Sequence, residues 1–185
     1  MTKTEARKLA KACRAAADLH TVGHAMAGVL FTLPAWQHAD TVLAFASMPD
    51  EPDTADILRQ ALAEGKRLLL PRVLSRTEMD WVEITALSQL QPGAYGILEA
   101  PASLPAFDTA HLGDGALALI PCLAASPDGV RLGRGGGYYD RFLAHYKGRR
   151  LLVCPTATLL GDLPCEGWDV RFSPHEILTE KGILL

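Results

Sequence analysis

The chain lacks the features that mark membrane, secreted and nucleic-acid-binding proteins. None of its apolar runs approaches the roughly 20 residues that a membrane span requires. The segment from Met1 to Arg7 has no apolar core of the kind found in signal peptides. Lys and Arg number 18 against 21 Asp and Glu, and this net charge of −3 argues against nucleic acid as the main partner. We therefore expect a cytoplasmic protein that binds neither membrane nor nucleic acid.

Cysteine is scarce and unpatterned. The chain has four cysteines with no CxxC pair among them: Cys13, Cys122, Cys154 and Cys165. Cys122 and Cys154 lie in apolar runs that resemble buried strands. We therefore expect all four to be reduced thiols rather than metal ligands or disulfide partners.

Two common nucleotide-binding loops are also absent, although glycines cluster in one place. We call this segment the glycine run: Arg131, Leu132, Gly133, Arg134, Gly135, Gly136, Gly137, Tyr138, Tyr139 and Asp140. No Lys-Ser/Thr pair follows its glycines, which excludes a Walker A loop. Tyr138 stands where a GxGxxG fingerprint needs its last glycine. No Ser or Cys occupies a nucleophile elbow, so covalent catalysis has little support.

The composition of the glycine run is suited to binding a polyanion. Glycine lets backbone N–H groups approach phosphate oxygens closely, and arginine adds a planar donor fork with permanent charge. A helix beginning at Tyr138 would add the positive end of its dipole. A flexible solvated loop is the plain alternative, and an Arg-Gly-Gly element of an RNA-binding tract is another, although such tracts are repeated and disordered.

Apolar periodicity predicts alternating helices and strands. We expect helices over 3–19 and 22–33, from Thr54 to Gly65, and after the glycine run to about His145. We expect strands over 41–46, 67–71, 79–84, 116–122, 151–154 and 177–178. The alternation predicts one α/β domain over 1–185, with three α/β/α layers and a mostly parallel, Rossmann-like sheet. Ligands of such sheets lie beyond the carboxyl ends of the strands, where the glycine run would be.

Several other polar residues are candidates for chemistry. The acidic cluster Asp50, Glu51 and Asp53 follows a predicted strand, although it could be only a solvated helix entrance. Asp140 and Asp169 suit Mg²⁺, which is held by one or two carboxylates together with phosphate oxygens; a helix cap and a turn are their alternative roles. His20 and His24 have the spacing of a helical metal pair but lack the accompanying glutamate, so we expect two ordinary exposed histidines.

Taken together, these motifs resemble the 5-formyltetrahydrofolate cyclo-ligase family, also called 5,10-methenyltetrahydrofolate synthetase. The resemblance is strongest from Gly129 to Asp140 and includes the preceding Pro121. It extends over Lys3 with Arg7, the segments 48–54 and 65–72, Leu163 with Pro164, Asp169, and Thr179 with Glu180. It covers essentially the whole chain.

The resemblance implies an ATP- and Mg²⁺-dependent conversion of 5-formyltetrahydrofolate to 5,10-methenyltetrahydrofolate by a monomeric enzyme, on a substrate with or without a polyglutamate tail. It places Arg134 and Tyr138 in catalysis, and Mg²⁺ on Asp140 and Asp169. ATP would be held by Lys3, Arg7, Arg131, Leu132, Gly133, Arg134, Gly135, Gly136, Gly137, Tyr138 and Tyr139. The folate would be held by Ala46, Glu51, Tyr95, Arg134, Gly135, Gly136, Gly137 and Tyr138.

The chain departs from the family pattern near the expected substrate edge. Ala125-Ser126 stands where Phe-Asp is usual, Pro155 and Thr158 replace a Phe and a Gln, and His175 replaces an Asp. Two alternatives stay open for this reason. One is an ATP-binding protein of this type with lost or altered folate activity, and the other is a sugar-phosphate- or coenzyme-A-binding protein on a similar sheet.

Overall fold

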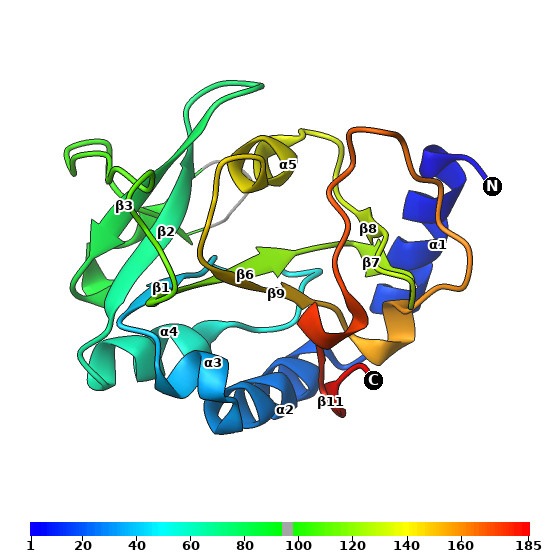
Figure 1. Ribbon diagram of the computed structural model, residues 1–185, viewed down its shortest axis with the longest axis horizontal. Helices are drawn as coiled ribbons and strands as arrows, with labels where there is room; N and C mark the ends of the chain where they lie inside the picture. The colour runs from blue at the N-terminus through cyan, green and yellow to red at the C-terminus, as the bar shows by residue number, and fades with distance from the viewer. Residues whose placement is uncertain (94–97) are drawn as a thin grey trace.

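A computed structural model describes residues 1–93 and 98–185, and its centre is a seven-stranded sheet (Figure 1). The strand order is β11-β10-β9-β6-β1-β2-β3. The strands are β1 (Thr41–Leu43), β2 (Arg67–Val73), β3 (Met79–Ile84), β6 (Ala116–Pro121), β9 (Arg149–Val153), β10 (Ile177–Thr179) and β11 (Gly182–Ile183). Neighbours from β10 to β2 pair in parallel, while β3 and β11 pair antiparallel at the two edges. The predicted mostly parallel sheet is confirmed.

Helices cover both faces of the sheet, because the central strands are apolar on both faces. The helices are α1 (Lys3–Ala15), α2 (Leu19–Thr32), α3 (Pro34–Gln37), α4 (Ala55–Ala63) and α5 (Tyr138–Leu143). α2, α3 and α4 cover one face and α5 lies on the other, while α1 lies beside one end of the sheet (Figure 1). Val42 of β1 packs into the core on the α2 side and its neighbour Leu43 into the core on the α5 side. The α/β class and its layers are therefore confirmed.

Most predicted elements are present with shifted ends. The first two helices are divided at Asp18, whose carboxylate accepts a hydrogen bond from the Thr21 N–H, so α1 ends at Ala15 and α2 begins at Leu19. The predicted end of a helix at Pro34 is where short α3 begins, since proline is well placed in a first turn. The helix after the glycine run stops at Leu143, before His145. The strand predicted to reach residue 46 ends at Leu43.

Thr54 precedes α4 as predicted but does not cap it with its side chain. Its hydroxyl donates instead to the Phe45 carbonyl at 2.7 Å, and its N–H meets the Ser47 hydroxyl at 3.3 Å. The Thr54 side chain therefore joins the segment after β1 to the start of α4. These hydrogen bonds fix both ends of the segment that carries the acidic residues.

Short elements that carry no periodic signal were missed. They are β4 (Gln91–Pro92), β5 (Leu98–Glu99), β7 (Ala124–Ala125), β8 (Arg131–Leu132) and the 3₁₀ helices η1 (Leu87–Gln89), η3 (Thr156–Thr158) and η4 (Pro174–Glu176). β7 and β8 form an antiparallel ribbon between β6 and the glycines, so the glycine run begins as a strand. Among the described residues no helix combines the length and apolarity needed to cross a bilayer.

Candidate functional site

The glycine run forms a loop between β8 and α5, and two of its glycines have backbone angles that other residues rarely adopt. Gly135 has φ +101° and Gly137 has φ +67°, and Gly137 is the residue from which α5 begins. Only a residue without a side chain adopts these conformations at little cost. The local sequence therefore determines a sharp turn that brings Arg134 to the loop's outer edge.

Arg134 is held by two consecutive carboxylates of the acidic cluster. Its Nη2 donates to Asp50 Oδ1 at 2.6 Å and to Glu51 Oε1 at 3.1 Å, and its Nη1 donates to Asp50 Oδ2 at 3.2 Å. The Glu51 side chain is only 8% exposed, and its other oxygen accepts the Met48 N–H at 3.0 Å. The acidic cluster is therefore part of the same site as the glycine run, as its place after β1 predicted.

The opposite charges of Arg134 and the two carboxylates, Asp50 and Glu51, attract one another. Partial burial works to raise the pKa of Asp50, but the hydrogen bonds and charge of Arg134 outweigh it, so the pKa is lowered. Burial works in the opposite direction on the Arg134 guanidinium, and the Asp50 hydrogen bond and the Glu51 charge raise its pKa above the ordinary value. Asp50 and Arg134 thus each favour their charged form.

α1 lies against the start of the glycine run. Arg7 Nε donates to the Gly133 carbonyl at 3.0 Å, and Arg7 also lines the space beside Gly135. Ala6 and Ala10 are fully buried against Leu132, and their small size allows the helix to approach β8 closely. Figure 1 shows α1 beside β7 and β8. Two segments more than 100 residues apart therefore form one cationic edge, as the hydrogen bond from Arg7 to Gly133 illustrates.

Lys3 bridges two carboxylates of the C-terminal loop. Its Nζ lies 2.8 Å from Asp169 Oδ2 and 2.5 Å from Glu166 Oε2. Partial burial works to raise the pKa of Asp169, but the hydrogen bonds from Lys3 and from the Glu166 N–H outweigh it and lower that pKa. Glu166 was not singled out from the sequence, because a lone glutamate in a loop gives no signal.

Arg131 pairs with one of the two aspartates predicted to bind metal. Its Nη2 donates to Asp140 Oδ2 at 2.8 Å and its Nη1 to the Pro121 carbonyl at 3.1 Å. Its positive charge also helps to lower the pKa of the other aspartate, Asp169. The Arg131 side chain is 6% exposed, and its Nε has no hydrogen-bond partner among the described residues. Arg131 therefore joins the end of β6 to Asp140.

The two tyrosines of the glycine run have different surroundings. The Tyr138 hydroxyl donates to the Ser75 carbonyl at 2.8 Å, which joins the loop to the β2–β3 hairpin, and the Arg141 guanidinium lies over its ring. Tyr139 packs instead against Trp81 and Arg131, and burial raises the pKa of its hydroxyl. The side chain of Leu132 is in the core. Leu132 and Tyr139 can therefore contact a ligand chiefly through their backbone groups.

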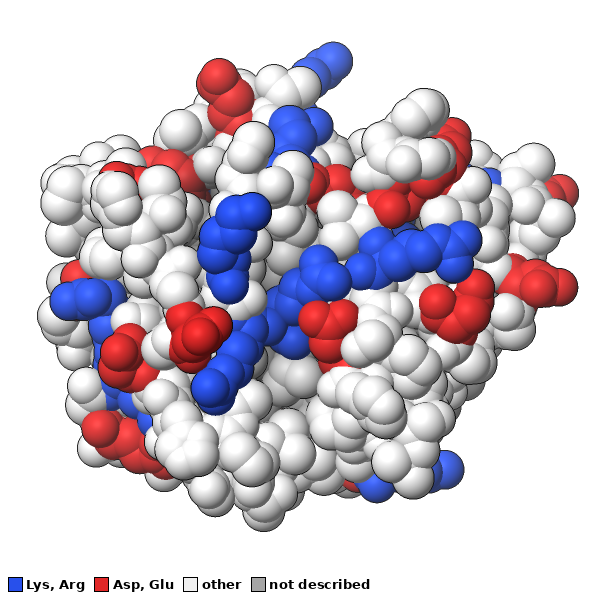
Figure 2. All heavy atoms as spheres, viewed as in Figure 1, with Lys and Arg blue, Asp and Glu red and all other residues white. Residues whose placement is uncertain are grey.

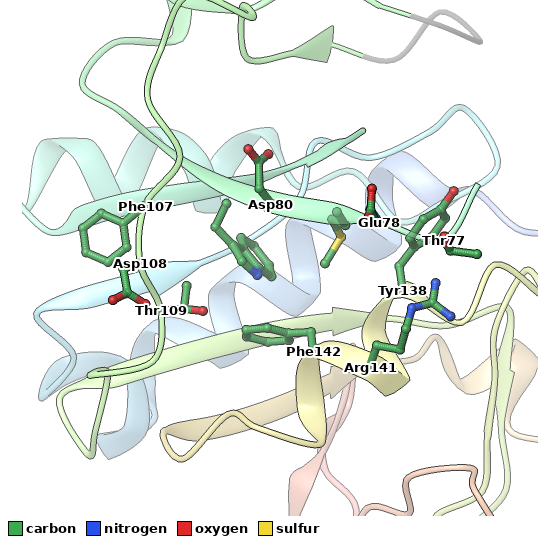
Figure 3. A pocket seen from close by; sticks show the side chains of 11 residues that line it. Thr77, Glu78, Asp80, Phe107, Asp108, Thr109, Tyr138, Arg141 and Phe142 are labelled. Carbon is green, nitrogen blue, oxygen red and sulfur yellow. The ribbon is translucent and has the colours of Figure 1, made fainter. Parts of the chain in front are cut away.

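An open cavity of about 400 Å³ lies on the other side of Tyr138 (Figure 3). Its lining is Thr77, Glu78, Met79, Asp80, Trp81, Phe107, Asp108, Thr109, Tyr138, Arg141 and Phe142. Figure 3 shows Tyr138, Arg141 and Phe142 rising from α5 opposite Phe107, Asp108 and Thr109. The cavity does not include Arg134 or the acidic cluster. It adjoins the candidate site without being its centre.

The remaining predicted residues are distributed as follows. Ala46 is half-buried after β1 and packs on the core at the α2 side. Tyr95 lies outside the described residues. His20 and His24 are exposed beside Asp53 and Asp56, and the described residues contain no group of three or more side chains that could hold a metal. The histidines thus make no metal pair.

The departures from the family pattern lie mostly below the surface. Ala125 and Thr158 have no exposed surface, and the Thr158 hydroxyl meets Cys154 Sγ at 3.6 Å. Pro155 is buried and His175 is exposed on η4. The Ala125 side chain is therefore enclosed by the protein. All four cysteines are free thiols, as predicted.

Acidic side chains lie beside many of the basic ones. On the face shown in Figure 2, a band of basic side chains crosses the surface, with acidic side chains adjoining it. Ion pairs such as Arg150 with Glu176 at 2.9 Å and Arg171 with Asp128 at 3.2 Å join the two kinds. Arg131 and Arg134 of the glycine run follow the same pattern, since each is paired with at least one carboxylate.

The fold and the site define an α/β protein with an arginine- and glycine-rich loop between β8 and α5. The family model described as "5-formyltetrahydrofolate cyclo-ligase family" matches residues 2–180. The chain belongs to this family, and it is an enzyme of the ligase class.

Named relatives and solved structures agree with this assignment. The chain is 31% identical over 154 residues to the 5-formyltetrahydrofolate cyclo-ligase of Escherichia coli, and the aligned region covers 80% of this chain and 84% of that protein. It is 30% identical over 152 residues to the enzyme of the same name from Mycolicibacterium smegmatis, over 78% of this chain and 76% of that one.

Among solved structures, the chain resembles the 5,10-methenyltetrahydrofolate synthetase of Aquifex aeolicus. The TM-score is 0.83 at 26% identity, over 100% of this chain and 92% of that one. The synthetase of Mycoplasma pneumoniae shares the fold, with a TM-score of 0.74 at 20% identity, over 97% of this chain and 99% of that one.

Proposed function

We propose that the protein converts 5-formyltetrahydrofolate to 5,10-methenyltetrahydrofolate at the expense of ATP, with Mg²⁺ as the metal. Family membership supports the overall reaction. The observation that carries the assignment to this site is the hydrogen bond between Arg7 and the Gly133 carbonyl, which brings α1 to the glycine run. Cations from both segments then face a common edge of the sheet, as binding of a triphosphate requires.

The nucleotide side of the site is proposed to comprise Lys3, Arg7 and the glycine run from Arg131 to Tyr139. Backbone N–H groups of Gly135, Gly136 and Gly137 would approach the phosphates, because no side chains stand in the way. Lys3 and Arg134 are now bound to carboxylates, and phosphate oxygens would compete with these for the same donors.

The folate side is proposed to comprise Ala46, Glu51, Tyr95 and the loop from Arg134 to Tyr138. The shielded Glu51 carboxylate is suited to accepting hydrogen bonds from the amino and N–H groups of a pterin. Arg134 contacts Glu51 and belongs to the glycine run, so it is placed to touch both substrates. We assign Arg134 and Tyr138 to the reacting centre.

Asp140 and Asp169 fit a magnesium ion that is shared with phosphate. Oδ1 of Asp140 accepts no hydrogen bond from the described residues, and Asp169 already holds a cation, the ammonium of Lys3. One or two carboxylates are the usual protein ligands of Mg²⁺, whose coordination is completed by substrate oxygens and water. Bound there, the ion would neutralise charge on the phosphates.

The chemistry requires activation of a formyl oxygen, which is a poor leaving group. The γ-phosphoryl group of ATP is transferred to that oxygen and ADP is released. The N10 amine of the folate then attacks the activated carbon and loses its proton, the C–O bond breaks, and inorganic phosphate leaves. Arg134 would stabilise the negative charge on the transferred phosphoryl group, and Tyr138 would help to orient the folate. Positioning and charge neutralisation are therefore the protein's main contributions.

We also propose that the enzyme acts as a cytoplasmic monomer on free folate, with or without a polyglutamate tail. The net charge of −3 supports a small-molecule partner over nucleic acid.

The decisive experiment follows the absorbance of the methenyl product after the purified protein is mixed with 5-formyltetrahydrofolate and Mg-ATP. Absorbance should rise with equimolar release of phosphate, and omission of ATP or addition of a chelator should prevent it. ATP binding without product would contradict the proposal and favour an altered folate activity. Binding of a sugar phosphate or coenzyme A, with no phosphate release in the presence of folate, would favour the third alternative.

A further inference from the structure

Arg14 is a buried cation that the proposed reaction does not use. It lies in the last turn of α1 and is 2% exposed. Its guanidinium has no carboxylate partner among the described ion pairs. It donates instead to three backbone carbonyls: Nε to Leu123 at 3.0 Å, Nη1 to Asp50 at 2.6 Å, and Nη2 to Cys122. Arginine stays charged in proteins, so a buried guanidinium needs hydrogen-bond acceptors, and each of the three Arg14 nitrogens has one.

The three carbonyls come from two segments, which Arg14 joins. Those of Cys122 and Leu123 directly follow β6, and that of Asp50 belongs to the acidic cluster. The Asp50 side chain and its neighbour Glu51 hold Arg134. Lys3, Arg7 and Arg14 recur on α1 at spacings of four and seven residues, which places them along one face of the helix. Arg14 therefore links the helix of the nucleotide side to the segment of the folate side.

Arg14 also balances charge. Two carboxylates surround the single guanidinium of Arg134, which leaves an excess of one negative charge beside a site proposed for a triphosphate. The buried Arg14 supplies the compensating positive charge, and its influence on Asp50 works in the same direction as that of Arg134. The charged groups that face Asp50 are thus Arg134 from the glycine run, Arg14 from α1 and Glu51 from its own segment.

We propose that Arg14 is a positioning residue for the ligation reaction, which fixes the Asp50–Glu51 segment against α1 and so aligns Arg134 and Glu51 between the two substrates. This inference rests on the proposed function. The fixing of the Asp50–Glu51 segment can also be tested without turnover, because two hydrogen-bonded amides report on its opening. The Met48 N–H donates to Glu51 Oε2 at 3.0 Å and the Glu51 N–H to the Met48 carbonyl at 2.9 Å.

The experiment compares wild type, Arg14→Met, Arg14→Lys and Arg150→Met. Arg150, at the start of β9, is a matched control because it is a half-buried arginine. It donates to one backbone carbonyl and to one carboxylate, that of Glu176. Amide hydrogen exchange of Met48 and Glu51 and the pH profile of kcat/KM are measured on each protein. Circular dichroism and urea unfolding establish that each variant is folded.

For Arg14→Met we expect faster exchange at both amides and a loss of about 30-fold or more in kcat/KM for 5-formyltetrahydrofolate. The acid limb of the profile should move to higher pH, because Asp50 loses a neighbouring positive charge. Arg14→Lys should return the acid limb to its wild-type position while recovering only part of the rate, since an ammonium lacks the planar fork. Arg150→Met should change neither exchange at these amides nor the acid limb.

Slow exchange and kcat/KM within about threefold of wild type in Arg14→Met would overturn the inference. The inference would also be overturned if Arg14→Met lost no more kcat/KM than Arg150→Met does and the acid limb of its pH profile did not move. If Arg14→Met does not fold, Arg14→Lys decides, and wild-type rates and exchange in that variant would reject the role. If wild type forms no methenyl product, the proposed function fails, while the exchange data still test whether Arg14 fixes the segment.

Discussion

Arg134 and Glu51 lie 83 residues apart in the chain and meet through a hydrogen bond of 3.1 Å between Nη2 and Oε1. The carboxylate is almost fully shielded from solvent, while about a third of the arginine side chain, 35%, stays exposed. Glu51 is therefore held in place, while the Arg134 guanidinium is open to a ligand. This difference suits an arginine that must keep its position and still contact substrates.

Replacing Arg134 by alanine should lower kcat/KM by at least about 100-fold, equivalent to roughly 2.7 kcal/mol, because phosphoryl transfer loses a preorganised positive charge. Circular dichroism should show that the fold survives. Arg171→Ala is the control, since Arg171 is an exposed arginine paired with Asp128 and its loss should leave the rate unchanged. Near-normal turnover in Arg134→Ala would remove this residue from the site.

Glu51→Gln keeps the shape of the side chain and removes its charge. The KM for 5-formyltetrahydrofolate should rise about tenfold, because a carboxylate accepts charge-assisted hydrogen bonds better than an amide does. The KM for ATP should stay within about twofold. Steady-state kinetics with each substrate varied in turn would measure both, with Glu83→Gln at a solvent-exposed ion pair as control. Equal losses for the two substrates would contradict the folate assignment.

Gly129 should tolerate no side chain. Its φ is +87°, and a Cβ built on it would lie 1.6 Å from the Phe172 carbonyl oxygen. Gly129→Ala should therefore lower the free energy of unfolding by about 2–4 kcal/mol, or the melting temperature by roughly 5–15 °C. Gly113→Ala meets nothing within 4 Å and should change stability by less than about 1 kcal/mol. Similar melting temperatures for the two variants would show that the ribbon can shift to make room.

The Lys3–Asp169 pair should make stability depend on pH in acid. The pKa of Asp169 is lowered in the folded protein, so the unfolded chain binds more protons as pH falls from about 4. The contribution of the pair is present above that pH and is lost as pH decreases through the lower folded pKa. Lys3→Met should make the decline between about pH 4 and 2 shallower, by less than about 1 kcal/mol because Lys3 is partly exposed.

Urea unfolding of wild type and Lys3→Met at pH 7, 4 and 3 would measure this difference. Lys8→Met, on the exposed face of α1, provides the control and should leave the decline unchanged. An identical acid decline in wild type and Lys3→Met would show that the pair contributes nothing to stability.

Periodic segments were predictable because burial on both faces of a parallel sheet requires continuous apolar runs. Strand β6 begins at its predicted residue for this reason. The β7–β8 ribbon was not predicted, because strands of two residues carry no period. The tertiary role of Thr54 was also not predictable, because its hydroxyl donates to the Phe45 carbonyl of another segment.

The candidate site divides in the same way. Residue type and position after a strand were enough to single out Asp50, Glu51 and the glycine run. They could not show that Arg131 pairs with Asp140, or that Arg134 is bound by the acidic cluster. Arg14 gave no signal at all, since a basic residue in the last turn of a helix is ordinarily explained by the helix dipole.

The sequence by itself determined the α/β class, the sharp loop at Gly135 and Gly137, and the family, because these depend on local backbone preferences and on the order of residue types. Only the tertiary structure decided which charges meet. Arg7 reaches Gly133, Arg134 reaches Glu51 and Arg14 reaches Asp50 because α1 packs against β8 and β1 pairs with β6, which brings distant segments together. Side-chain pairing across such distances is set by the packing of the whole chain, and no short segment encodes it.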